Sequence, residues 1–365
     1  MAFSALDHQH MARALQLAEL GLTTTSPNPR VGCVIAHGDT VVGEGWHRRA
    51  GEAHAEVHAL RAAGHRAEGA TAYVTLEPCA HHGRTPPCAD ALIATKVARV
   101  VIAMGDPNPL VAGQGIARLN HAGIPAEYGL LGAQAQELNL GFLSRMTRNR
   151  PWVRLKAATT LDGKTALNNG VSQWITGSAA RADGHRWRAR ACAILTGIGT
   201  VKADDPQLTV RDVPCERQPL RVLVDARFDV RADARLFNGD PVLVVTARPD
   251  PDKAALLAER NVHTVSLPNA QGKVDLPALL ELLAQRGINE LHVEAGFKLN
   301  GSLLREGCVD ELLLYTAPML VGDAAQGLFN LAELSELQQA RQLVWHDVRQ
   351  VGKDMRFVGR FQPAG

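Results

Sequence analysis

What the 365-residue chain lacks excludes several classes of protein. Aromatic residues make up only 4% of it, so it has little surface on which flipped or single-stranded bases can stack. Its 39 basic and 37 acidic residues leave a net charge of +2, which argues against a broad nucleic-acid-binding face. No run approaches the roughly 18 uninterrupted apolar residues of a membrane-spanning helix. We therefore expect this protein to bind neither nucleic acid nor a membrane.

The first eight residues also lack the basic start and apolar run of a secretory leader. The cysteines, at positions 33, 79, 88, 192, 215 and 308, are scattered without the spacing of a disulfide framework. Reduced thiols are typical of cytosolic proteins, so the sequence predicts a cytoplasmic location.

The length of the chain predicts two domains, because it exceeds the size at which a single hydrophobic core usually stops growing. Segment 145–151 is polar and basic and is closed by a proline, as inter-domain linkers often are. We therefore predict domains at 1–146 and 151–365. In the first, periodicity favours helices at 7–20, 54–63 and 88–95 and strands at 31–35, 40–45, 70–75 and 99–103. Such alternation indicates a largely parallel sheet covered on both faces.

One His, one Glu and two Cys carry the clearest chemistry. His54, Cys79 and Cys88 can supply three ligands of a tetrahedral zinc and leave the fourth position to water, as in catalytic zinc sites. Glu56 lies two residues after His54 at a predicted helix start, so it faces elsewhere and is free to carry protons. The pattern predicts hydrolytic deamination at Zn²⁺ with Glu56 as the catalytic acid and base. The alternative is that these residues are ordinary buried core residues.

The spacing of the two cysteines narrows the predicted class of deaminase. Eight residues separate Cys79 from Cys88, where the commoner deaminase signature has two. Together with His54-Ala55-Glu56, segment 75–88 (TLEPCAHHGRTPPC) resembles the deaminase half of the bifunctional deaminase-reductases of riboflavin biosynthesis. His58, His81 and His82 stay open between ligand, neighbour of the site and plain surface. Asn28, between two prolines, is either a substrate contact or a turn residue.

The second half resembles the reductase domain of the same family, which is similar in fold to dihydrofolate reductase. The resemblance rests on segments 160–165, 172–176, 199–211 and 293–296, in the expected order. It implies an α/β protein with an N-terminal cytidine-deaminase-like three-layer domain and a C-terminal dihydrofolate-reductase-like α/β domain. The turn 197–200 after an apolar strand lacks the third glycine of a dinucleotide fingerprint, so by itself it fits a phosphate site or an ordinary turn.

The resemblance also implies roles for individual residues. NADPH would contact Ala158, Trp174, Thr200, Asp204, Gly296, Phe297, Lys298, Leu299, Asn300, Gly301 and Ser302. Substrate would contact Ser172, Arg188, Leu208, Arg211 and Glu294, with Lys156 near the transferred hydride. The two arginines suit bidentate contacts to a phosphate. The chain departs from the family at Ala226, where a hydroxyl residue often follows the strand aspartate.

The resemblance implies a complete function. The enzyme would deaminate 2,5-diamino-6-(5-phosphoribosylamino)pyrimidin-4-one at Zn²⁺ and then use NADPH to reduce the ribosyl group to a ribityl chain. The substrate would be a phosphorylated pyrimidine, and the protein a homodimer or higher homo-oligomer. Two alternatives are a nucleic-acid base deaminase with an accessory domain, and a binding or regulatory protein with a structural zinc.

Overall fold

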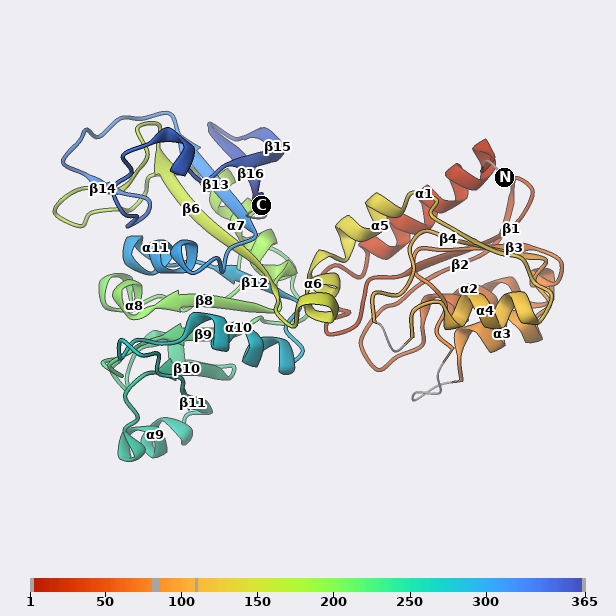
Figure 1. The fold of residues 1–365 in the computed structure, drawn as a ribbon, viewed down its shortest axis with the longest axis horizontal. Coiled ribbons are helices and arrows are strands. Elements are labelled where there is room, and N and C mark those ends of the chain that lie inside the picture. The colour runs from red at the N-terminus through yellow and green to blue at the C-terminus, as the bar shows by residue number, and fades with distance from the viewer. Residues whose placement is uncertain (1–2, 81–85, 109–110, 363–365) are drawn as a thin grey trace. The chain divides into compact units, whose positions relative to one another are not determined.

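The computed structural model describes residues 3–80, 86–108 and 111–362 and separates the chain into two compact units, Met1–Asn149 and Arg150–Gly365 (Figure 1). Because their relative placement is not determined, each unit is described by itself.

The N-terminal unit is a five-stranded sheet between two layers of helices. The strands are β1 (Gly32–His37), β2 (Thr40–Trp46), β3 (Thr71–Val74), β4 (Arg99–Ile102) and β5 (Ala126–Tyr128), in the order β2-β1-β3-β4-β5. β1 runs antiparallel to β2 and β3, whereas β3, β4 and β5 are parallel. The helices are α1 (Ala5–Glu19), α2 (Ala55–Ala63), α3 (Cys88–Ala94), α4 (Gln114–His121), α5 (Gly132–Leu138) and α6 (Leu140–Arg148), with a 3₁₀ turn at Gly64–Ala67. In Figure 1, α1 and α5 lie on one face of the sheet, and α2, α3 and α4 lie on the other. The predicted three-layer architecture is confirmed.

Local chemistry explains where the first helices begin. Ser4 caps α1 through a capping box with Asp7, so the helix starts two residues earlier than the apolar pattern predicts. His54 is the N-cap of α2, which places its side chain at the helix start and leaves Glu56 in the first turn. α2 packs closely on β2 because Gly43 and Gly45 face it: a Cβ on Gly45 would lie 2.5 Å from the Ala55 carbonyl oxygen.

The C-terminal unit is built on a nine-stranded mixed sheet with strand order β11-β10-β9-β8-β12-β6-β13-β16-β15. The strands are β6 (Trp152–Thr160), β8 (Ala193–Gly197), β9 (Leu220–Val224), β10 (Val242–Thr246), β11 (Val262–Ser266), β12 (Glu290–Val293), β13 (Glu311–Ala317), β15 (Leu343–Val351) and β16 (Asp354–Phe361), and β7 (Lys164–Ala166) pairs separately with β14 (Gln326–Gly327). The strands from β11 to β13 are parallel, and the β15–β16 hairpin adds to β13 antiparallel. Helices α7 (Ser178–Arg190), α8 (Ile198–Asp204), α9 (Pro251–Ala258), α10 (Leu276–Gln285) and α11 (Phe297–Arg305) connect them, with 3₁₀ turns at Arg235–Phe237 and Leu337–Gln339.

This sheet places the candidate reductase residues at one edge. β8 and β12 are neighbours and parallel, so the segments that follow their carboxyl ends come together, as in other open α/β sheets that bind ligands, and β6 runs on beside them from Lys156 to Thr160. β8 leads into α8, and β12 leads through residues 294–296 into α11.

Candidate active sites of the two domains

The three predicted zinc ligands meet at one point of the N-terminal domain. His54 begins α2, Cys88 begins α3, and Cys79 follows β3. Their ligand atoms all lie within 4.8 Å of one another. His54 Nδ1 is 3.2 Å from Cys88 Sγ and 3.6 Å from Cys79 Sγ. Tetrahedral Zn–N and Zn–S bonds of about 2.0 and 2.3 Å would separate these atoms by about 3.5 Å, so the donor set fits zinc.

The electrostatics of the two thiols also favour a metal. The Cys88 thiol donates to the Cys79 sulfur, which lowers the pKa of Cys79 to about 4 and raises that of Cys88. The backbone N–H of Cys88, at the start of α3, also donates to Cys79 Sγ at 3.3 Å. This arrangement favours the thiolate on Cys79, and binding of a dication would release the thiol proton of Cys88.

Glu56 lies beside the ligands without being one of them. It is 3% exposed, and burial raises its pKa to about 7 against the opposing effect of the nearby His54. A carboxyl group with a pKa near the working pH exists in both protonation states and can accept a proton and return it. The geometry therefore fits the acid–base role predicted for Glu56.

A second buried carboxylate, Glu77, fixes the segment that carries Cys79. Its Oε1 accepts from the backbone N–H groups of Gly115 at 2.9 Å and Ile116 at 3.2 Å. Its Oε2 accepts from those of Gly113 at 3.0 Å and Asp106 at 3.1 Å. The sequence prediction missed this role, because the four donors lie 29 to 39 residues further along the chain.

His47 is a further residue that the motifs did not reveal. Its Nδ1 is 3.1 Å from the carbonyl oxygen of Ala53, which can only accept, so Nδ1 carries the proton. Its Nε2 therefore accepts from the side-chain amide of Asn28, 3.0 Å away. Burial lowers the pKa of His47, in keeping with a neutral ring. This pairing turns the Asn28 amide nitrogen toward His47 and leaves Oδ1, which has no hydrogen bond within the described residues, to accept from a ligand.

Three histidines stay open as neighbours or ligands of this site, and two of them lie outside the described residues. His81 and His82 lie in 81–85, which the structure does not describe. His58 lies one turn after His54 on α2, and its Nε2 has no hydrogen-bond partner within the described residues.

In the C-terminal domain, the structure brings Lys156, Arg188 and Glu294 together. Val293 of β12 pairs with Leu155 of β6, so Glu294 follows beside Lys156. Arg188 on α7 donates to both carboxylate oxygens of Glu294, at 2.5 and 2.9 Å. Burial would raise the pKa of Glu294, but the Arg188 guanidinium holds it well below its usual range. Burial lowers the pKa of Lys156, and Glu294 opposes that change.

The residues predicted to hold the cofactor gather around the starts of α8 and α11. The Thr200 hydroxyl lies 3.7 Å from where a Cβ on Gly296 would stand, so the two turns are neighbours. Gln173 donates at 3.4 Å to Asp204, the last residue of α8, which brings the segment of Trp174 to the other end of that helix. Trp174 is 68% exposed and stacks with Arg181. Ala158 is on β6, and residues 297–302 form the first turns of α11.

The remaining predicted substrate residues are more dispersed. Leu208 is buried with a positive φ of 53°, and Arg211 is exposed. Ser172 is half-buried in the segment before α7. The guanidinium of Arg188 is already occupied by Glu294 and by the carbonyl oxygen of Thr209, so Arg188 orients these groups as well as any ligand it contacts.

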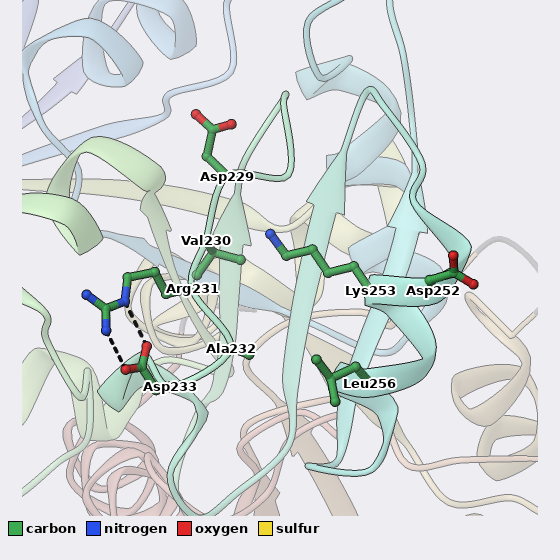
Figure 2. Close-up of a pocket in the computed structure, with 8 residues that line it drawn as sticks. All are labelled: Asp229, Val230, Arg231, Ala232, Asp233, Asp252, Lys253 and Leu256. Atoms are coloured by element: carbon green, nitrogen blue, oxygen red, sulfur yellow. Dashed lines mark hydrogen bonds and ion pairs between the residues drawn. The ribbon is translucent and has the colours of Figure 1, made fainter.

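A surface depression of the C-terminal domain is lined by other residues. Figure 2 shows its lining, which comes from the loop after β9 and from α9: Asp229, Val230, Arg231, Ala232, Asp233, Asp252, Lys253 and Leu256. Two of its carboxylates form ion pairs within the protein, Asp233 with Arg231 and Asp229 with Lys202. None of the residues predicted for either site lines it.

Over the described ranges 3–80, 86–108 and 111–362, the structure has no helix that is long and apolar enough to cross a membrane.

Comparisons with known proteins cover nearly the whole chain. Residues 4–104 match the cytidine and deoxycytidylate deaminase zinc-binding region, and residues 151–357 match the RibD C-terminal domain. The riboflavin biosynthesis protein RibD of Escherichia coli is 49% identical, over 96% of this chain and 98% of its own length. That of Bacillus amyloliquefaciens is 42% identical, over 97% of this chain and 96% of its own length.

Solved structures of related proteins superimpose on nearly the whole chain. Acinetobacter baumannii RibD superimposes with a TM-score of 0.90 at 44% identity, covering 98% of this chain and 99% of its own. A diaminohydroxyphosphoribosylaminopyrimidine deaminase/5-amino-6-(5-phosphoribosylamino)uracil reductase from Thermotoga maritima gives 0.87 at 32% identity, covering 98% and 99%. The predicted resemblance, the fold of both domains and the pair of cofactors, Zn²⁺ and NADPH, are confirmed. The chain belongs to the RibD family of bifunctional riboflavin-biosynthesis enzymes, which join a zinc-binding deaminase domain to a reductase domain.

Proposed function

We propose that the deaminase domain acts on 2,5-diamino-6-(5-phosphoribosylamino)pyrimidin-4-one and that the reductase domain then reduces the ribosyl group of the product with NADPH. The observation that carries the first step is the convergence of His54, Cys79 and Cys88 beside the buried Glu56. The substrate class is supported by the Thermotoga maritima relative, whose name specifies both reactions. We assign residues 1–146 to the deaminase domain and 151–365 to the reductase domain.

In the deaminase site, His54, Cys79 and Cys88 would hold the metal. Zinc, when bound, supplies Lewis-acid activation of water. Glu56 would take a proton from that water and deliver it to the leaving amine, which suits a carboxyl group whose pKa is about 7. Asn28, whose amide nitrogen is turned toward His47, would accept a hydrogen bond from the pyrimidine through Oδ1.

In the reductase site, the turns around Thr200 and Gly296 and the start of α11 would hold NADPH, which supplies the hydride. Ser172, Leu208 and Arg211 would contact the substrate. Lys156, in the middle of β6, lies beside Glu294, which directly follows β12, and there the substrate ribose would meet the cofactor. Arg188 would hold Glu294 ionised and contribute to binding of the phosphate.

The experiment that tests this function incubates the zinc-loaded protein with the proposed pyrimidine, with and without NADPH, and records ammonia and nicotinamide absorbance. We expect ammonia in both samples and consumption of NADPH only after ammonia appears. Ammonia without consumption of NADPH would contradict the reductase assignment. Neither signal would contradict the substrate, and other aminated pyrimidines would then be compared.

We also propose that the protein is a homodimer or higher homo-oligomer in the cytoplasm. β15 lies at the edge of the sheet and exposes Val344, Trp345 and Val348, an apolar set that a second copy would cover. The six cysteines all lie in the described residues and form no disulfide there, as in reduced cytosolic proteins. Light scattering of the purified chain measures its mass, and a monomeric mass would contradict the oligomer.

A further inference from the structure

The segment 208–211 presents two of the proposed substrate contacts of the reductase, Leu208 and Arg211, yet it belongs to no helix or strand. Backbone N–H and C=O groups that lack a ladder partner need other partners when they are shielded from water. The residues that hold this segment therefore decide where its side chains point.

Two side chains hold the middle of the segment. The Arg188 guanidinium donates to the carbonyl oxygen of Thr209 at 3.0 Å. Gln218 binds both backbone groups of Val210: its Oε1 accepts from the N–H at 2.8 Å, and its Nε2 donates to the carbonyl oxygen at 3.1 Å. These bonds replace the ladder that a neighbouring strand would supply.

His185, on α7, holds the backbone of Arg211. Its Nδ1 accepts from the Arg211 N–H at 3.2 Å, and its Nε2 lies 3.3 Å from the Asp212 carboxylate. Because a backbone N–H only donates, Nδ1 carries no proton, and the neutral ring bears its hydrogen on Nε2, toward Asp212. The imidazole is 7% exposed, so the bond is shielded from water.

The charged groups around His185 shift its pKa in opposite directions. Burial has the largest effect and lowers its pKa. Arg188 and Arg211 lower the pKa further, whereas Asp212 and Glu294 raise it. The lowered pKa favours the neutral ring that the bond to Arg211 requires.

The direction of the Arg211 side chain depends on the hydrogen bond between its backbone N–H and His185. The side chain is exposed, and within the described residues its guanidinium makes one hydrogen bond, to the Thr209 hydroxyl at 3.2 Å. A guanidinium binds a phosphate in a bidentate manner only when its direction is fixed. The direction of Arg211 is set by the backbone to which His185 is bonded.

We propose that His185 is a positioning residue for reduction, which orients Arg211 toward the substrate phosphate without touching the substrate. This inference rests on the proposed function, in which Arg211 contacts the ribose phosphate. It predicts that loss of the Nδ1 acceptor weakens substrate binding and leaves NADPH binding and the chemical step intact.

Two isosteric substitutions separate positioning from folding. In His185→Asn, the side-chain oxygen reaches the place of Nδ1 and can still accept from Arg211. In His185→Gln, the amide reaches the place of Nε2, and the bond to Arg211 is lost. Reduction of 5-amino-6-(5-phosphoribosylamino)uracil is measured with the full-length chain at saturating NADPH, and ammonia release in the same preparation reports on the intact deaminase domain.

For His185→Gln we expect KM for the uracil substrate to rise about 5- to 30-fold, because one shielded hydrogen bond is lost. The kcat of reduction should stay within about twofold of the wild-type value. His185→Asn should stay close to the wild type, and KM for NADPH should not change in either variant. Equal behaviour of the two variants, a fall in kcat at constant KM, or loss of NADPH binding would each overturn the proposal.

Arg211→Ala tests the proposed phosphate contact separately from the positioning role of His185. If its KM stays unchanged, the proposed phosphate contact is wrong, and the role of His185 is overturned with it. If its KM rises but that of His185→Gln does not, only the positioning role is overturned.

Discussion

Replacement of Glu77 by Gln tests whether a buried carboxylate keeps the zinc ligands in place. The carboxylate accepts four backbone N–H bonds from residues 106–116 and is 5% exposed. In Glu77→Gln, one oxygen becomes an NH₂ group that cannot accept. Two backbone donors lose their partner, at about 1–3 kcal/mol each, so the free energy of unfolding of the deaminase domain should fall by about 2–6 kcal/mol.

The assay is urea unfolding of the zinc-loaded full-length chain, followed by transfer of zinc to a coloured chelator, because this readout reports on the deaminase domain. With a denaturant slope of about 2 kcal/mol per molar, the midpoint should fall by about 1–3 M. Glu68→Gln is the matched control, since Glu68 is exposed and forms only a 3.5 Å ion pair with Lys96. That pair contributes at most about 1 kcal/mol. Equal midpoints for the two variants would refute the reasoning.

Three further predictions concern the same domain. Glu56→Gln should lower the kcat of deamination by about 10²–10⁴-fold, with zinc content unchanged and with NADPH consumption unchanged when 5-amino-6-(5-phosphoribosylamino)uracil is supplied directly, and ammonia release by the variant at the wild-type rate would exclude Glu56 as the proton carrier. Gly115→Ala should destabilise the domain by about 1–3 kcal/mol, because its Cβ would stand 2.0 Å from the Pro78 carbonyl oxygen, and thermal unfolding measures this. Burial alone would raise the pKa of Asp7, but hydrogen bonds, including one from Arg99, lower that pKa to about 2. Because the folded-state pKa is depressed, Asp7 adds stability above its unfolded pKa of about 4 that is lost as the pH falls through 2. The difference in melting temperature between the wild type and Asp7→Asn should therefore shrink over that range, and a constant difference would contradict the assignment.

The sequence alone predicted the parts of the deaminase site that depend on local spacing. His54 and Glu56 lie on one helix start, and the Pro-Cys pair and Cys88 lie close along the chain, so residue type and spacing carried the information. In the same domain, apolar runs predicted the buried parallel strands β3 and β4.

The hairpin β15–β16 escaped prediction for a physical reason. β15 is an edge strand whose apolar residues Val344, Trp345 and Val348 are exposed, so its pattern is not that of a strand with one buried face. Its partner β16 pairs with β13, about 40 residues earlier, and no local periodicity shows that pairing.

Glu77 and His185 explain why the supporting residues of both sites were harder to find than the reacting ones. Each accepts from backbone N–H groups of a distant segment: Glu77, two residues before Cys79, from residues between 106 and 116, and His185 from Arg211 itself. Any backbone N–H can make such a bond, so the segment that receives it needs no characteristic residue type. The donors also lie at sequence separations of 26 to 39, set by the sheet topology and not by a helical or strand period. Chemistry that depends on the identity of a side chain is therefore visible in the sequence, whereas support that depends on the path of the backbone becomes visible only in the folded chain.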